Sequence, residues 1–326
     1  MSKIKRIGVL TSGGDAPGMN AAIRAVTRTA IYNDLEVFGI RHGYEGMING
    51  WFKPLKSYHV SNIIQHGGTI LKTARSEEFM TKEGMQKAYD KLKDNYIDAV
   101  VVIGGDGTFR GAREFTSEFK IPVVGVPGTI DNDLYGTDFT IGFDTAINTV
   151  VQAVDKIRDT ASSHSRLFFI EVMGRDAGFI ALRSGIAVGA EAILIPEVET
   201  NVATLKDYLE KGKKRKKSSN IIIVAEGDDA GGAYDIAEKV KEDFKDYDVR
   251  VTCLGHIQRG GSPSAFDRFL ASRLGAAAVE ALLDDQQSIM VGYINQEIVH
   301  TTFNKTVKHN RTINMNLLEL ADMLTF

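Results

Sequence analysis

The stretch IDAVVVIGGDGT, residues 97–108, carries the pattern on which the fold prediction depends. Its first half is a nearly continuous run of valine and isoleucine, which is typical of a strand buried on both faces of a parallel sheet. Its second half, GGDGT at 104–108, is glycine-rich and polar, so the chain is expected to turn there. A buried strand that ends in such a loop predicts an α/β fold with ligands bound at the strand's carboxyl end.

Seven further apolar runs resemble this strand, and stretches with helical periodicity separate them. The helical pattern is clearest at 19–32, 145–161 and 265–283. Strands that alternate with helices predict a doubly wound α/β/α sandwich with mainly parallel sheets. A length of 326 residues predicts two such lobes rather than one. The other strands are expected at 7–10, 35–40, 121–127, 167–173, 192–197, 220–226 and 249–255.

The composition excludes several classes of protein. Hydrophobic residues make up 43% and charged residues 25% of the chain, as in ordinary globular proteins. The net charge of −3 gives no basic field that would attract nucleic acid. The N-terminal apolar run is too short for a signal peptide, and no run approaches the ~20 residues that span a bilayer. We therefore expect a cytoplasmic protein without membrane or nucleic-acid partners, in which Cys253 is a buried, reduced thiol.

One segment has a biased composition, the basic run KGKKRKK at 211–217. It has no accompanying aromatic residues, which favours a solvated loop or small-anion site over a nucleic-acid patch or an import signal.

Six predicted strands are followed by residues suited to binding or catalysis. Glycines let backbone N–H groups approach a phosphate closely, and the start of a helix adds a favourable dipole. Each loop alone is equally compatible with a tight structural turn, but together they outline a cleft at the carboxyl ends of the strands. The sequences are TSGGDAPGMN (11–20), GGDGT (104–108), PGTIDND (127–133), MGRDAG (173–178), Glu226 and GHIQRGGSP (255–263).

Three aspartates in these loops suit phosphoryl transfer. Asp106 can hold Mg²⁺ directly or through water, or it can cap a helix. Phosphoryl transfer needs a group that accepts or orients the attacking hydroxyl, together with positive charge on the moving phosphate. Asp131 can supply the first requirement, while Asp131 and Asp133 can also be two capping residues of a loop.

Positive charge is plentiful at the predicted strand ends and loops. The planar guanidinium donates two hydrogen bonds at once to a phosphate. One such arginine is usually a solvated surface residue, whereas five in these positions predict a phosphorylated substrate. His256 is either a further donor or a core histidine. The arginines are Arg75, Arg166, Arg175, Arg250 and Arg259.

Along nearly its whole length the chain resembles the bacterial ATP-dependent 6-phosphofructokinases. GGDGT is shared with other kinases, including those acting on NAD and on lipids, but PGTIDND, MGR and GHIQRGG in this order are highly specific. The motifs that carry the resemblance are GVLTSGGDAPGMNAAIR, VVIGGDGT, GVPGTIDND, IGFDTA, RDTASSHSR, EVMGR, PEVE and LGHIQRGGSP.

The resemblance implies a glycolytic kinase that transfers the ATP γ-phosphoryl group, with Mg²⁺, to the 1-hydroxyl of fructose 6-phosphate. It implies that Asp131 is the base, flanked by Thr129 and supported by Asp133, and that Arg175 and Arg75 stabilise the transferring phosphoryl group. ATP is expected at Gly14, Arg75, Ser76, Gly105, Asp106, Gly107 and Thr108, with Asp106 serving Mg²⁺. The sugar phosphate is expected at Thr129, Ile130, Asp131, Arg166, Met173, Gly174, Arg175, Glu226, Arg250, His256, Ile257, Gln258 and Arg259.

The resemblance also implies a homotetramer in which Arg166 and Arg250 reach the 6-phosphate of a neighbouring subunit. Residues 1–142 plus 257–304 are expected to form the ATP lobe, and 143–256 plus 305–326 the fructose 6-phosphate lobe, with the active site between them.

A regulatory site for ADP and phosphoenolpyruvate is implied as well. Arg24 and Arg28 are four residues apart on one helix face, which is also typical of a solvated surface. Relatives add an arginine at the position of Ser57, so we expect weakened regulation. The implied effector residues are Arg24, Arg28, Arg158, Gly189, Ala190, Glu191, Arg215 and Lys217.

The phosphoryl donor is the main alternative. Relatives that use pyrophosphate carry Asp at position 107 and Lys at 128, where this chain has glycine. A carboxylate at 107 would crowd and repel the α-phosphate of ATP, so ATP is favoured. Ser76 stands where some relatives have an aromatic residue, which leaves the preference for ATP over GTP open. An NAD or lipid kinase has no need of PGTIDND, and a non-enzymatic sugar-binding protein has no use for Asp106 and Asp131 together.

Overall fold

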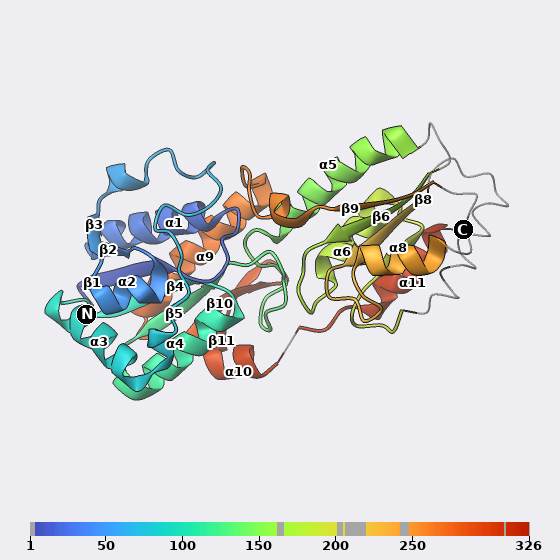
Figure 1. Cartoon of the computed structure of the whole chain (residues 1–326). Helices are drawn as coiled ribbons and strands as arrows, with labels where there is room; N and C mark the ends of the chain where they lie inside the picture. The colour runs from blue at the N-terminus through green and yellow to red at the C-terminus, as the bar shows by residue number, and fades with distance from the viewer. Residues whose placement is uncertain are drawn as a thin grey trace. The chain divides into compact units, whose positions relative to one another are not determined.

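The computed structural model describes residues 4–161, 166–200, 205, 220–241, 248–309 and 311–325. The chain forms two compact units, each assembled from separate stretches of sequence (Figure 1). Unit 1 consists of Met1–Ile130, Leu134–Thr145 and Arg259–Arg311. Unit 2 consists of Asp131–Asp133, Ala146–Gln258 and Thr312–Phe326.

Unit 1 is built on a seven-stranded sheet with the order β11-β10-β5-β4-β1-β2-β3. Its five inner strands are parallel, and the two edge strands β3 and β11 are antiparallel to their neighbours. Every residue of β4 is buried, as its run of valine and isoleucine predicts. The strands are β1 Arg6–Thr11, β2 Glu36–Ile40, β3 Phe52–Leu55, β4 Ala99–Gly104, β5 Val123–Pro127, β10 Ile289–Ile294 and β11 Glu297–Thr302.

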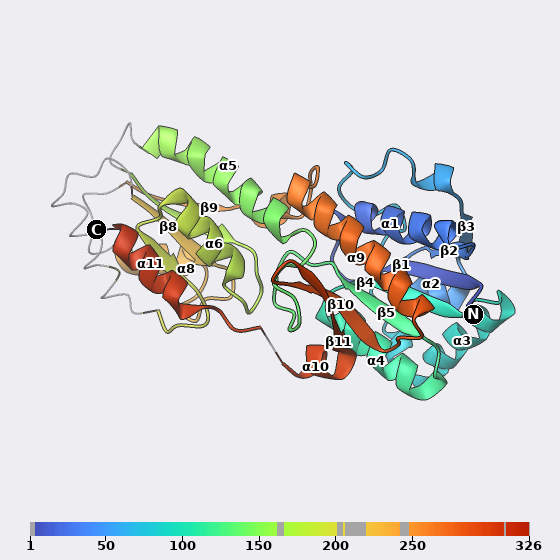
Figure 2. The same ribbon diagram turned by 180° about the vertical axis from the view of Figure 1, so that it is seen from behind.

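Helices cover both faces of this sheet (Figures 1 and 2). On one face α1 packs closely on α9 at Gly275, where an added Cβ would lie 2.7 Å from the Ala25 Cβ. The other face carries the main core cluster, which includes Met47, Leu92 and Phe109 from three different helices. The helices of unit 1 are α1 Met19–Tyr32, α2 Gly43–Asn49, α3 Lys82–Asp94, α4 Asp106–Phe119, α9 Ala265–Leu283 and α10 Phe303–Lys308.

Unit 2 is built on a four-stranded, wholly parallel sheet with the order β7-β8-β6-β9. Its core cluster joins β6 and β8 to α8, through residues such as Phe169, Val224 and Ile236. The strands are β6 Arg166–Val172, β7 Ala192–Leu194, β8 Asn220–Ala225 and β9 Asp248–Cys253, and the helices are α6 Phe179–Val188, α8 Ala233–Lys241 and α11 Met315–Thr325. A further helix, α5 Phe143–Ala161, starts in unit 1 and continues in unit 2.

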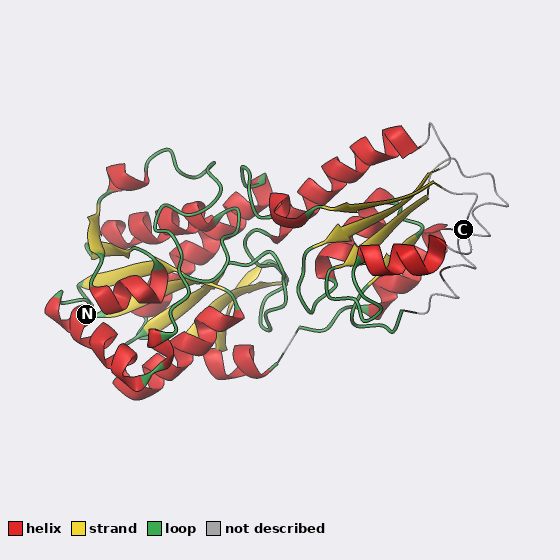
Figure 3. Cartoon of the chain, in the orientation of Figure 1, coloured by secondary structure: helices red, strands yellow, loops and turns green. Residues whose placement is uncertain are grey.

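The predicted fold class, two doubly wound lobes with mainly parallel sheets, is confirmed (Figure 3). The helices predicted at 19–32 and 265–283 match α1 and α9, whereas β7 ends three residues before the predicted 197. Strands β3, β10 and β11 were not predicted. Strand β3 contains Pro54, which suits only a sheet edge. The partly exposed strand β11 lacks a continuous apolar run.

The prediction that Cys253 is buried is wrong. Cys253 is the last residue of β9, an edge strand, and its side chain is exposed. Partial burial and then the neighbouring Glu171 carboxylate raise the pKa of the thiol. Among the described helices, none is both long and apolar enough to cross a membrane.

Candidate functional site

The loop after β4 opens directly into α4. Gly105 is the capping residue, and the first helical hydrogen bond runs from the Phe109 N–H to the Gly105 carbonyl at 3.1 Å. The N–H groups of 106–108 therefore point out of the positive end of the helix, as an anion site requires. Asp106 lies in the first turn, so the alternative that it is the capping residue is wrong; its carboxylate pairs with Arg110 Nε at 2.8 Å.

The donors at this helix end fit a phosphate-bound divalent metal. The Thr108 hydroxyl is buried and has no hydrogen-bond partner among the residues that the structure describes. A Cβ added at Gly107 would meet no described atom within 4 Å, so there is space above it. In the described parts of the chain, no three His, Cys, Asp or Glu side chains gather around a metal position. One carboxylate and one hydroxyl suit Mg²⁺, which keeps several waters and takes further ligands from phosphates.

The predicted nucleotide loop after β1 is in contact with a predicted sugar-phosphate residue. Gly13 has a φ of 84°, which glycine adopts without strain. The Arg259 guanidinium lies over Gly14, 2.6 Å from where a Cβ would be, and donates to the Asp15 carbonyl at 3.3 Å. The structure thus brings Gly14 and Arg259 together within unit 1.

Ser76 anchors the loop that carries Arg75. Its hydroxyl donates to the Glu45 carboxylate at 2.7 Å and accepts from the Phe79 N–H at 3.3 Å. Arg75 itself is exposed.

Sequence reasoning missed Tyr44 in this region. The Tyr44 hydroxyl donates to the Thr108 carbonyl at 2.6 Å, and its ring stacks on Phe79 with centroids 4.0 Å apart. Burial raises the pKa of Tyr44, so the phenol stays a donor. Tyr44 follows the strand predicted at 35–40, but no local spacing links it to Thr108, which is 64 positions away.

The segment after β5 is held on two sides. The Gly128 N–H donates to the Gly104 carbonyl at 2.9 Å, and the Thr140 hydroxyl donates to the Thr129 carbonyl at 2.6 Å. Thr129, Ile130 and Asp131 are all buried. Asp131 therefore extends from a braced segment.

Within unit 2, Asp131 lies beside the carboxyl ends of the strands. Arg175 Nε is 4.0 Å from its carboxylate. Arg175 has a φ of 54°, in the left-handed region, and Glu226 supports this turn by accepting the N–H groups of Gly174 at 3.2 Å and Arg175 at 2.8 Å. The Gln258 side chain accepts the Met173 N–H at 3.2 Å. These predicted residues come together at one edge of the sheet.

Two predicted phosphate ligands lie toward the amino-terminal ends of the strands in that sheet. Arg166 is the first residue of β6 and Arg250 the third of β9. Both bind the Asp248 carboxylate, at 3.1 and 2.9 Å. Although desolvation acts in the opposite direction, the two guanidiniums lower the pKa of Asp248.

His256 and Ile257 lie on the short 3₁₀ turn that follows β9, and both side chains are exposed. The alternative that His256 is a core histidine is therefore wrong. Neither side chain is locked by packing, which leaves His256 available as a donor.

The predicted effector residues fall into three groups. Arg24 and Arg28 share a face of α1, and burial followed by the Arg28 charge lowers the pKa of Arg24. In unit 2 the Arg158 guanidinium donates to the Val188 carbonyl, beside the predicted turn 189–191. Arg215 and Lys217 lie outside the described residues. Ser57 is the first residue of a short 3₁₀ turn.

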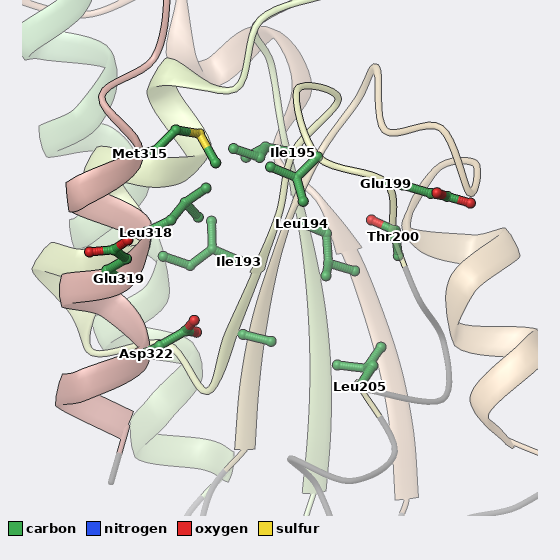
Figure 4. A pocket seen from close by; sticks show the side chains of 12 residues that line it. Ile193, Leu194, Ile195, Glu199, Thr200, Leu205, Met315, Leu318, Glu319 and Asp322 are labelled. Carbon is green, nitrogen blue, oxygen red and sulfur yellow. The ribbon is translucent and has the colours of Figure 1, made fainter.

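Unit 2 also contains a cavity of about 350 Å³ between β7 and α11 (Figure 4). Its walls are mostly apolar, with carboxylates at the rim contributed by residues such as Glu199 and Glu319. The lining residues include none that was predicted to bind substrate, nucleotide or effector.

The chain is similar to known proteins along most of its length. The sequence pattern of the family described as Phosphofructokinase matches residues 6–282. The chain is 59% identical over 325 residues to ATP-dependent 6-phosphofructokinase 2 of Bacteroides thetaiotaomicron, and the match covers 100% of both chains.

Two solved structures have a similar fold. The phosphofructokinase of Saccharomyces cerevisiae superposes with a TM-score of 0.89 and 37% identity over 98% of this chain and 48% of that chain, so the present chain spans about half its length. The pyrophosphate-dependent phosphofructokinase of Marinobacter aquaeolei gives a TM-score of 0.85 at 21% identity over 98% of this chain and 91% of that chain. A pyrophosphate-dependent enzyme thus shares the fold, and the fold alone does not identify the donor.

Proposed function

The chain belongs to the phosphofructokinase family, and on that premise we propose that it is an ATP-dependent 6-phosphofructokinase of glycolysis. It transfers the γ-phosphoryl group of ATP to the 1-hydroxyl of D-fructose 6-phosphate, giving fructose 1,6-bisphosphate and ADP. The observation that carries this proposal is the buried Asp131 carboxylate with Arg175 Nε 4.0 Å away. The relative from Bacteroides thetaiotaomicron, which covers the whole chain, supports it.

Asp131 accepts the proton of the 1-hydroxyl as that oxygen attacks the γ-phosphorus. Its burial excludes competing water, and the braced segment before it fixes its position. Arg175 places positive charge beside Asp131, where charge on the transferring phosphoryl group has to be stabilised. Arg75 supplies a second positive charge, and Asp133 supports the loop that carries the base.

The nucleotide is held at the start of α4. The backbone N–H groups of 106–108 and the glycines of the loops at 13–14 and 104–105 receive its phosphates. When bound with ATP, Mg²⁺ would supply positive charge that stabilises the phosphates. Asp106, with the Thr108 hydroxyl beside it, would hold this metal or its waters.

The two glycines at 107 and 128 favour ATP over pyrophosphate for different reasons. The open space above Gly107 accommodates the α-phosphate, which a carboxylate there would repel. Gly128 is enclosed, since an added Cβ would lie 3.1 Å from an Ile103 methyl and 3.3 Å from the Met19 methyl. The large side chain of a lysine at 128 therefore requires its neighbours to shift.

The sugar phosphate is proposed to draw on two chains of a homotetramer. From Arg166 to Val172 a strand advances about 20 Å, which is far beyond the reach of an arginine side chain. Arg166 therefore cannot reach the carboxyl ends of the strands in its own sheet. Because Arg250 shares the Asp248 carboxylate with it, we assign both arginines to the 6-phosphate of a neighbouring subunit, where they meet His256 and Arg259. We also propose that residues 1–142 plus 257–304 bind ATP, that 143–256 plus 305–326 bind fructose 6-phosphate, and that the protein is cytoplasmic.

ADP and phosphoenolpyruvate are the proposed effectors. The Arg158 contact beside the turn 189–191 supports an anion site at this turn. Because Ser57 brings no charge, we propose that regulation is shallow.

The test is a coupled assay for fructose 1,6-bisphosphate with fructose 6-phosphate as acceptor, run with Mg-ATP and with pyrophosphate. We expect turnover with ATP and little with pyrophosphate. Gly107→Asp provides a matched variant, because its side chain enters open space and should impair the use of ATP without unfolding the chain. Turnover by the native chain with pyrophosphate in place of ATP would overturn the donor assignment, and turnover with neither would overturn the proposal.

A further inference from the structure

Asp267 is a fully buried carboxylate that has no role in the mechanism above. It lies in the first turn of α9 but caps a different helix. Its oxygens accept hydrogen bonds from the Gly142 N–H at 2.9 Å, the Thr145 N–H at 2.8 Å and the Thr145 hydroxyl at 2.5 Å. All three donors lie at the start of α5.

The starts of α5 and α9 cap each other (Figure 2). The Ser264 hydroxyl accepts the Asp267 N–H at 3.1 Å and donates to Asp144 at 2.6 Å. The Ser264 N–H donates to the Thr145 hydroxyl at 3.0 Å. We call Asp144, Thr145, Ser264 and Asp267 the double cap. Its bonds join residues about 120 positions apart in the sequence, so they fix tertiary rather than local structure.

The double cap is linked to the segment that carries the catalytic base. Gly142 lies against this segment, because an added Cβ would be 3.3 Å from an Ile130 methyl. The Ile141 N–H donates to the Pro127 carbonyl at 2.9 Å, and Ile141 pairs with Gly128. With the Thr140 bond to the Thr129 carbonyl, residues 140–142 flank 127–130 along its length.

We propose that Asp267 is a positioning residue for phosphoryl transfer. By fixing Gly142 and Thr145 it fixes the segment 140–142, which in turn fixes 127–130 and the point from which Asp131 extends. The inference rests on the proposed function, because it takes Asp131 as the base.

The chemistry of the side chain makes this claim specific. A carboxylate offers two oxygens that only accept, so it satisfies all three donors, whereas an asparagine in its place turns an NH₂ group toward one of them. A buried N–H that loses its partner shifts until it finds another. The displacement is transmitted through 140–142, and a shift of about 1 Å at a reacting group lowers the rate about 10²-fold.

The experiment compares Asp267→Asn, Thr145→Val and Thr145→Ser with the native chain. Asp98→Asn is the control, because Asp98 also accepts two backbone N–H bonds, from Lys5 at 2.8 Å and Arg6 at 2.9 Å, where β1 and β4 begin. Circular dichroism and thermal unfolding establish that each variant folds, and kcat and both KM values are then measured.

We expect kcat of Asp267→Asn to fall by about 10²-fold while the KM for either substrate changes little. The kcat of Thr145→Val should fall by a smaller factor. Thr145→Ser keeps the hydroxyl, so its kcat should equal that of the native chain. Asp98→Asn should keep native kcat whatever it loses in thermal stability.

Folded Asp267→Asn and Thr145→Val chains with native kcat would overturn the inference, as would a rise in KM at unchanged kcat. If Asp267→Asn does not fold, the inference is tested by comparing Thr145→Val with Thr145→Ser: native kcat in folded Thr145→Val would overturn it. A native chain without turnover overturns the proposed function, and this inference with it. A native chain that is active alongside an equally active Asp267→Asn variant overturns the inference alone.

Discussion

Arginines are held differently at the two ends of the strands in the unit 2 sheet, which we call its carboxyl edge and its amino edge. At the carboxyl edge, Arg175 sits in a turn held by Glu226 and lies beside the buried Asp131. At the amino edge, Arg166 and Arg250 share the exposed carboxylate of Asp248. The first edge is organised around the proposed base of its own chain. The second edge holds two cations around one exposed carboxylate, which is compatible with our proposal that the phosphate of a neighbouring subunit's substrate binds there.

Asp131→Asn breaks the carboxyl edge and has the largest expected effect. Loss of a general base should lower kcat by ~10²–10⁴-fold. The KM for fructose 6-phosphate should change little, because the other sugar ligands remain. Steady-state kinetics measures both values, and a variant that keeps most of its turnover would remove Asp131 from the mechanism.

Arg166→Ala and Arg250→Ala break the amino edge. Each variant loses a charged hydrogen bond to the 6-phosphate that is worth ~1.5–3 kcal/mol. The KM for fructose 6-phosphate should therefore rise roughly tenfold to a hundredfold, and far more than the KM for ATP. An equal rise in both KM values would contradict the assignment of these arginines to the sugar phosphate.

Ser57→Arg adds the arginine that this chain lacks at the proposed effector site. A restored phosphate contact should strengthen effector binding by ~1.5–3 kcal/mol, so activation by ADP and inhibition by phosphoenolpyruvate should both become steeper. The measurement is the fructose 6-phosphate saturation curve with and without each effector. Strong regulation of the native chain that the substitution leaves unchanged would contradict the weakened site.

Asp267 and Asp248 should make the free energy of unfolding depend on pH in opposite directions. Burial raises the pKa of Asp267 to about 6 despite the three hydrogen bonds that its carboxylate accepts. Its contribution to stability is therefore present below pH ~4 and is lost as the pH rises through 6, by on the order of 3 kcal/mol. The pKa of Asp248 is lowered, so its contribution is present above pH ~4 and is lost as the pH falls further.

This contrast is tested by measuring the thermal unfolding midpoints of the native chain, Asp267→Asn and Asp248→Asn between pH 3.5 and 7.5. A difference of 1 kcal/mol should shift the midpoint by about 2–4 °C. The midpoint of the native chain should exceed that of Asp267→Asn by less as the pH rises, and it should exceed that of Asp248→Asn by less as the pH falls. Parallel curves for the native chain and Asp267→Asn would show that Asp267 does not titrate in this range.

The sequence was sufficient to predict most of the buried strands and the loops that follow them, although the buried strand β10 was missed. Strand β4 is buried throughout, so its apolar pattern is unambiguous. The edge strands β3 and β11 escaped prediction, because a strand with one open side needs no continuous apolar run. The boundaries of α1 and α9 were predicted correctly, and both helices bury residues along their length.

The motifs supplied the site residues but not their contacts. No pattern showed that Arg166 and Arg250 meet at Asp248, since this depends on the register of β6 against β9. The bond from Tyr44 to Thr108 and the capping of α5 by Asp267 also join residues far apart in the chain. Such contacts depend on the tertiary fold, and local spacing carries no signal for them.

The central claim is that one active site combines the carboxyl edge of one chain with the amino edge of another. Mixing Asp131→Ser chains with Arg166→Ala chains, after dissociation and reassembly, tests it most directly. Each parent alone should be nearly inactive at low fructose 6-phosphate. The account predicts that the hybrids regain activity, because some sites then receive an intact Asp131 from one chain and an intact Arg166 from its neighbour. Hybrids that are shown to contain both chains and yet remain as inactive as the parents would contradict it.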